Sequence, residues 1–205
     1  MEKQTVDPLM IRLFEFRPRK GDLKKAEIIT AAIECLSEDG LEKTTFEAIA
    51  KRIGTRRAHV NYYFSDKQNI FLSAIQYIAA TYQSISLECL ENASESENLL
   101  DAYLQGPFKW AKNHPEQLSV MFLLYYLSTF QSEYLELNHQ IRKGGAQRIS
   151  YILRKKDTSL SKKEADLKAK SIQNILSGCL LDVATTKGRT LASAEKEVKR
   201  LVSLI

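Results

Sequence analysis

The segment from Thr44 to Lys67, TTFEAIAKRIGTRRAHVNYYFSDK, limits the possible folds more than any other part of the chain. Two short helices can cross closely, at about 90–120°, only if the residue at the crossing is small, the turn tolerates a positive φ and an apolar residue of the second helix fills the gap. Ala50, Gly54 and Val60 stand at those three positions. The spacing therefore predicts a helix-turn-helix.

Capping and apolar spacing place the first helix of this pair. Thr44 and Glu47 have the spacing of a capping box, which predicts a helix that begins near Thr45. This register directs one pair of residues to the core and leaves another pair toward solvent. The first pair is Ile49 and Ile53, and the second is Lys51 and Arg52.

On the second helix, Val60 and Phe64 lie one turn apart and are predicted to face inward. The residues left on its remaining surface are Arg56, Arg57, His59, Asn61, Tyr62 and Tyr63. Guanidinium, imidazole, amide and phenol groups read base edges and hold phosphates in a major groove. The pattern predicts a DNA-binding surface; a purely structural corner between two helices is the alternative.

Over about residues 24–72 the chain resembles the TetR family of transcriptional regulators. The shared positions are Thr44, Thr45, Ile49, Ala50, Gly54, Tyr62, Tyr63, Phe64 and Lys67. The resemblance implies an all-α fold, in which an N-terminal three-helix domain with a helix-turn-helix precedes a larger helical ligand-binding and dimerisation domain. Together with the residue types, it gives a set of expected contacts to double-stranded DNA. That set is Thr45, Arg56, Arg57, His59, Asn61, Tyr62, Tyr63 and Lys67.

The start of the second helix departs from the family pattern. Where members usually carry Ser-Lys-Gly, this chain has Arg56, Arg57 and Ala58, so the usual cap is lost and Thr55 is expected to cap one residue earlier. Two adjacent arginines offer bidentate donors to guanine or phosphate. The family's first Tyr of the run is Asn61 here, which either reads adenine or remains a solvent-facing or phosphate-contacting amide.

Periodicity and polar breaks predict three segments: an N-terminal extension over 1–21, the helix-turn-helix domain over 22–67 and the larger domain over 68–205. The extension is read as a frayed tail or as a basic arm that lies on DNA. Gly40 is expected to end the first helix, and Ser65, at capping-box spacing from Gln68, to begin a long one. The last two helices are predicted to flank the turn at Lys187-Gly188.

A small-molecule effector is expected in the larger domain, where a proline inside an apolar helix should bend it and leave space beside an aromatic helix. The candidate lining residues are Tyr103, Pro107, Trp110, Phe122, Tyr125 and Tyr126, and ordinary core packing is the alternative. The resemblance implies a homodimer through the last two helices. The candidate interface residues are Ile175, Gly178, Val198 and Val202.

Composition bounds the function classes. The net charge of +5 is mild, but five basic residues against one acid between Lys51 and Lys67 place a local excess on the proposed recognition unit. A larger basic excess over residues 142–163 is read as a solvated helix end and loop, with a second binding surface as the alternative. The longest apolar run, over 118–130, is too short for a membrane span of about 20 residues.

Cysteines and histidines are scattered, which predicts buried thiols in a reducing cytoplasm and neither a metal site nor a cofactor. No Gly-rich phosphate loop, GxSxG or HExxH motif suggests an enzyme. The sequence predicts a cytoplasmic one-component regulator, a repressor by family base rate, which binds a palindromic operator as a dimer and is released by a small molecule. The alternative is an all-α adaptor or small-molecule-binding protein that does not bind DNA.

Overall fold

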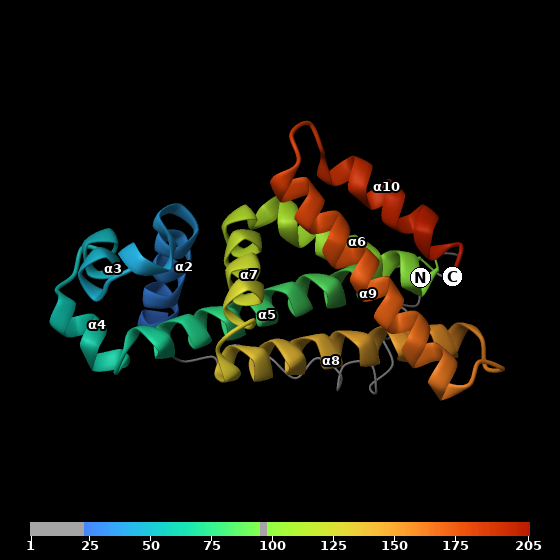
Figure 1. The fold of residues 1–205 in the computed structure, drawn as a ribbon, viewed down its shortest axis with the longest axis horizontal. Coiled ribbons are helices and arrows are strands. Elements are labelled where there is room, and N and C mark those ends of the chain that lie inside the picture. The colour runs from blue at the N-terminus through green and yellow to red at the C-terminus, as the bar shows by residue number, and fades with distance from the viewer. Residues whose placement is uncertain (1–22, 95–97) are drawn as a thin grey trace. The chain divides into compact units, whose positions relative to one another are not determined.

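The computed structural model describes residues 23–94 and 98–205, and every regular element within them is an α-helix. The all-α class predicted from the sequence is confirmed. The N-terminal extension lies outside the described residues. The helices are α2 (Leu23–Lys43), α3 (Phe46–Arg52), α4 (Arg57–Tyr63), α5 (Lys67–Glu91), α6 (Leu99–Asn113), α7 (Pro115–Leu127), α8 (Ser132–Lys156), α9 (Lys162–Thr185) and α10 (Leu191–Val202) (Figure 1).

The described residues form two compact units. The HTH unit comprises residues 23–81 and 114–135, and so contains α2, α3, α4, the first part of α5, and α7. The C-terminal unit comprises residues 82–94, 98–113 and 136–205, which hold the end of α5, α6, most of α8, α9 and α10. The predicted domain boundary between residues 67 and 68 stays a prediction.

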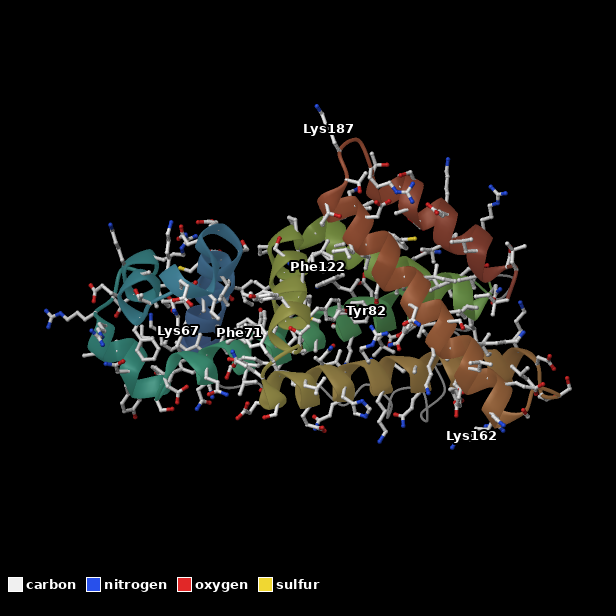
Figure 2. The ribbon with its side chains drawn as sticks, viewed as in Figure 1. Lys67, Phe71, Tyr82, Phe122, Lys162 and Lys187 are labelled. Atoms are coloured by element: carbon white, nitrogen blue, oxygen red, sulfur yellow. The ribbon has the colours of Figure 1, made fainter. Side chains whose placement is uncertain are left out.

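The HTH unit is closed by apolar side chains from each of its helices, and α7 packs against α2. Ala50 and Val60 are fully buried at the crossing of α3 and α4, and Phe64 is 4% exposed, as the spacing predicted. Phe71 of α5 packs edge-on against Tyr134, with 5.0 Å between ring centroids (Figure 2). The core of this unit therefore packs against the buried side of the helix-turn-helix.

Three predicted helix caps are each wrong by one residue. The cap of α3 is Thr45, whose hydroxyl accepts a hydrogen bond from Ala48 N at 3.1 Å, because the neighbouring Thr44 is buried and donates its hydroxyl to Gly40 O at 2.7 Å. The cap position of α4 is Arg56, which makes no side-chain capping bond, and not Thr55. At α5 the capping side chain is Asp66, which accepts from Asn69 N at 2.7 Å, while Ser65 donates its hydroxyl to Asp66.

The break predicted at Gly40 is confirmed. Gly40 has φ 76° and ψ 179° inside the span of α2, so the regular helix stops there and a short turn continues to Lys43. Backbone of this kind favours glycine because a Cβ is disfavoured at positive φ. Gly54, at φ 64°, plays the same part in the turn between α3 and α4.

In the C-terminal unit, the end of α5 crosses α6 closely. A Cβ placed on Gly106 would lie 2.6 Å from Ser86 Oγ and 2.8 Å from Ser86 Cα, so only glycine fits there without a shift. Pro107 follows within α6, which continues as one helix from Leu99 to Asn113. The crossing of these two helices is therefore set by main-chain contact.

The last two helices of the C-terminal unit form the predicted pair. α9 and α10 pack against each other and run side by side in Figure 1, and α10 also packs on α6. Gly188, at φ 81°, makes the turn between them. Arg189 pairs with Asp182 at 2.7 Å and with Glu197, which ties the end of α9 to α10. Ser161 and Glu164 form a reciprocal capping box at the start of α9.

The three cysteines are free; Cys35 and Cys179 are buried and Cys89 is half-buried. Within residues 23–94 and 98–205, no helix is long and apolar enough to cross a membrane. Over the same residues, His, Cys, Asp and Glu side chains do not gather into a group that could hold a metal ion.

Candidate nucleic-acid interface

The turn between α3 and α4 is held by its own backbone. Gly54 N donates to Lys51 O at 3.2 Å and Thr55 N donates to Ala50 O at 2.8 Å, so the chain reverses within a few residues. At the start of α4, His59 N donates to Arg56 O at 2.9 Å. With its apolar side buried in the HTH unit, α4 presents a fixed opposite face to solvent.

That exposed face of α4 consists of two adjacent rows of side chains. Arg57 and Asn61 lie one turn apart in one row, and Ala58 and Tyr62 lie one turn apart in the other. All four are exposed, and Tyr62 is 83% exposed. Guanidinium and amide groups on neighbouring turns are suited to base edges, and the phenol is suited to phosphate oxygens.

Two of the expected contacts lie deeper than the sequence suggested. His59 is half-buried, its Nε2 is buried without a hydrogen-bond partner, and its ring packs 5.4 Å from the ring of Tyr63. Tyr63 is also half-buried, and it packs edge-on against Tyr62 at 5.1 Å. In this conformation the Nε2 atom of His59 is shielded from solvent, and the two tyrosine rings pack on each other.

The sequence placed Arg52 toward solvent, but in the structure its guanidinium is paired with carboxylates of α2. Nη1 of its guanidinium donates to Glu34 and to Glu38 of α2, each at 3.1 Å. Nη2 donates a further hydrogen bond to Glu38. The hydrogen bond from Arg52 holds the pKa of Glu38 below its ordinary value. Burial raises the pKa of the nearby Cys35 thiol against the lowering effect of Arg52. Arg52 therefore fastens α3 to α2, a long-range pairing that no local pattern revealed.

Lys67 also has a partner inside the HTH unit. Its Nζ donates to the main-chain oxygen of Glu42 at 3.0 Å, and the side chain is half-buried (Figure 2). Lys51, Arg56 and Arg57 are exposed, and none of them makes an ion pair within the part of the chain that the structure describes. Of the basic residues counted in the sequence, these three are the ones whose charge is available at the surface of the helix-turn-helix. Thr45 is exposed but uses its hydroxyl as the cap of α3.

The expected effector residues fall in both units. Tyr103 and Trp110 are buried in the C-terminal unit, where the Trp110 ring meets Tyr82 edge-on at 5.6 Å. Phe122 and Tyr125 are half-buried on α7 of the HTH unit, with 6.2 Å between their rings. Tyr126 is 64% exposed and packs on Phe130, so it does not face the interior of its unit, contrary to the expectation. Pro107 is buried within α6.

The expected dimer residues all lie in the C-terminal unit and differ in exposure. Gly178 is exposed, with nothing within 4 Å of an added Cβ, and Ile175 and Val202 are half-buried. Val198 is fully buried within its own unit and offers no exposed surface to a second copy in this structure. Sequence reasoning missed two exposed leucines on α9, Leu167 and Leu181, although their heptad spacing could have signalled them.

Comparisons with known proteins agree with this geometry. The family model described as bacterial regulatory proteins, tetR family, matches residues 28–74, which span most of α2, the helix-turn-helix and the start of α5. The HTH-type transcriptional regulator BetI of Proteus mirabilis is 24% identical over 179 residues, which are 85% of this chain and 87% of that protein. The nucleoid occlusion factor SlmA of Haemophilus influenzae is 28% identical over 93 residues, or 45% of this chain; the match spans 43% of that protein, less than half of its length.

A solved structure shares the fold over nearly its whole length. It is a candidate transcriptional regulator from Saccharomonospora viridis in complex with choline, and it superposes with a TM-score of 0.78 at 16% identity. The match covers 89% of this chain and 97% of that one. Over residues 28–74 the chain is a member of the tetR family of bacterial regulatory proteins.

Proposed function

We propose that this protein is a cytoplasmic, ligand-responsive transcriptional regulator that binds an operator through the exposed face of α4. The observation that carries the proposal is the pair of rows formed by Arg57 with Asn61 and Ala58 with Tyr62 on a helix whose other side is buried. Neither arginine of the pair Arg56 and Arg57 is drawn into an ion pair among the described residues, so their donors remain available to DNA.

The proposal assigns different tasks to the residues of this face. Arg57 and Asn61 read base edges in the major groove, and Tyr62 with Arg56 contacts the phosphate backbone. Thr45 lies at the start of α3 and is exposed, so its backbone is accessible to a phosphate, while His59 and Tyr63 support the face from beneath. The regulator acts as a repressor.

The operator is proposed to be palindromic and read by a homodimer. On α9 an uncharged row of exposed side chains runs through Leu167, Asn174, Gly178 and Leu181, and Ile175 borders it. An exposed, uncharged row with leucines at heptad spacing is suited to packing against a second copy of the same helix. In such a dimer, the two copies of α4 meet half-sites with centres about 34–36 Å apart, or a multiple of that distance.

The effector is proposed to be a small, mostly apolar molecule that carries one or two polar groups. Tyr82, Tyr103 and Trp110 gather aromatic surface in the C-terminal unit, which supports such a ligand. The relative from Saccharomonospora viridis was solved with choline, which supports small-molecule binding by this fold without identifying the ligand here. Ligand and DNA are coupled because each favours one state of the dimer.

The decisive experiment measures binding of duplex DNA from upstream of the protein's own gene, by fluorescence anisotropy. Arg57→Ala should weaken specific binding by about 1–3 kcal/mol and relax the preference at one base position. Arg154→Ala removes an equally exposed arginine from the end of α8 and serves as the matched control, with no change expected. If folded Arg57→Ala binds the operator as tightly as the wild type, α4 is not the helix that reads the bases. If the wild type prefers no duplex sequence, the result favours the alternative of an adaptor that does not bind DNA.

A further inference from the structure

The first residue of α5, Lys67, stands where a cation is electrostatically disfavoured. The N-terminal end of a helix carries partial positive charge, which attracts carboxylates and repels ammonium groups. Asp66 meets this preference: the backbone N–H of Asn69 and then the hydroxyl of Ser65 hold the pKa of Asp66 below its ordinary value. Lys67 does not meet it, and its ammonium instead reaches away from the helix to the carbonyl of Glu42 at 3.0 Å.

That carbonyl belongs to the corner that leads into the helix-turn-helix. The regular path of α2 stops at Gly40, and both the N–H and the hydroxyl of Thr44 donate to Gly40 O, at 3.3 Å and 2.7 Å. Thr45 is then extended and caps α3. Glu42 thus lies between a helix break and an extended residue, where no following helical turn supplies a donor for its carbonyl. The bond from Lys67 ties this corner to the beginning of α5.

We propose that Lys67 is a positioning residue that fixes the corner before α3 against the start of α5, and does not act as a phosphate contact. The inference rests on the proposed DNA-binding function, and it reverses the role that the sequence motif alone assigns to this lysine. Its ammonium sets the approach of α3 and α4 to DNA by holding residues 41–43 in place. Because α5 is continuous from Lys67 to Glu91, the same bond attaches the corner to a 25-residue helix that runs from one unit into the other.

The two roles differ in how binding depends on salt. A lysine that neutralises one phosphate contributes about 0.9 to the slope of log K against log salt, so its removal lowers the magnitude of that slope by this amount. A positioning bond contributes the same free energy at every salt concentration. Its removal should weaken binding by roughly threefold to tenfold, the effect of a single hydrogen bond, and leave the slope unchanged.

The test compares Lys67→Met with Arg56→Met, the proposed phosphate contact, in titrations of the upstream duplex from about 50 to 200 mM salt. Methionine keeps the length of the side chain and removes charge and donors in both variants. We expect Lys67→Met to bind more weakly with the wild-type slope, and Arg56→Met to bind more weakly with a reduced slope. In the free protein, hydrogen exchange at the Thr44 amide should accelerate in Lys67→Met and stay unchanged in Arg56→Met.

Each other outcome has a defined meaning. A slope reduced by about 0.9 in Lys67→Met would make Lys67 a phosphate contact and overturn the inference. Wild-type affinity, or an unchanged exchange rate at Thr44, would also overturn it. If the wild type binds no duplex, the proposed function fails, while the exchange experiment still decides whether Lys67 holds the corner.

Discussion

Replacing Gly106 by alanine tests how rigidly the end of α5 is set against α6. The new Cβ would lie 2.8 Å from Ser86 Cα and 2.6 Å from Ser86 Oγ. Two carbon atoms are at their best separation near 3.5–4.0 Å, so the helices must separate by roughly 0.7–1.2 Å at the crossing. The main-chain contact leaves no flexible side-chain end that could simply move aside.

The expected loss of stability is the difference between two opposing effects. Alanine within a helix favours folding by about 0.5–1 kcal/mol relative to glycine. Overpacking of a close contact costs about 1–3 kcal/mol. We therefore expect Gly106→Ala to lower the free energy of unfolding by about 1–2 kcal/mol, since the steric cost exceeds the gain in helix propensity.

Gly144→Ala provides the matched control in α8. The nearest atoms to a Cβ at Gly144 would be those of the Arg148 guanidinium, at ordinary distances of 3.5 Å or more. This variant should gain about 0.5–1 kcal/mol, so the difference between the two variants isolates the steric cost, because helix propensity cancels. Urea unfolding followed by far-UV circular dichroism at one protein concentration gives both values.

The result that would refute this reasoning is a Gly106→Ala protein as stable as Gly144→Ala. Such an outcome would mean that the α5–α6 crossing relaxes freely. Adding Ser86→Ala should not rescue Gly106→Ala, because the contact at 2.8 Å to Ser86 Cα remains after the hydroxyl is removed. Full rescue by this second change would show that the hydroxyl alone made the contact tight.

Three further outcomes are expected. Gly178→Glu should sediment as a monomer at micromolar concentration and lose tight operator binding, while Gly178→Ala should not; a monomeric wild type would contradict the dimer. Asp66→Asn should destabilise the protein fully above about pH 4 and progressively less below it, because the depressed folded pKa of Asp66 contributes stability that is lost as pH falls through the folded pKa; a difference in unfolding free energy that stays constant as pH falls would oppose this. Fluorescence emission of Trp110, the single tryptophan, should change when effector binds. A compound that releases DNA without changing this emission, and that releases DNA equally well from the Trp110→Phe protein, would place the effector site elsewhere.

Helix content and the helix-turn-helix corner were predictable from the sequence, because both depend on local spacing. Ala50, Gly54 and Val60 meet steric requirements that few other residues satisfy, and Gly188 makes the turn after α9 where expected. The caps were less predictable. Thr44 and Thr45 are adjacent and chemically alike, and only the burial of Thr44 in the tertiary structure decides which of them caps α3.

The residue types of the candidate site were predictable from the sequence. Which of its charged side chains are free of partners inside the fold, and so available to DNA, was less predictable. Arg52 and Lys67 carry the right charge for DNA, yet one pairs with carboxylates 14 and 18 residues away and the other bonds a carbonyl 25 residues away. Pairings over such distances depend on the packed fold and have no local signature. Likewise, Val198 lies on an amphipathic helix whose apolar face fits inside the chain or against a partner equally well, and the structure buries it inside.

The exposed rows of α4 have a consequence for how readily operator preference can change. Arg57, Ala58 and Asn61 are exposed and contribute nothing to the buried core, which depends on Val60 and the residues behind it. Substitutions at such surface positions usually alter stability by no more than about 0.5 kcal/mol. Their side chains can therefore be exchanged in a combinatorial library with little loss of folded, expressible protein. With operator recognition by α4 as proposed, the residues for recognition and those for folding lie on opposite sides of one seven-residue helix, and new operators should be selectable without redesign of the scaffold.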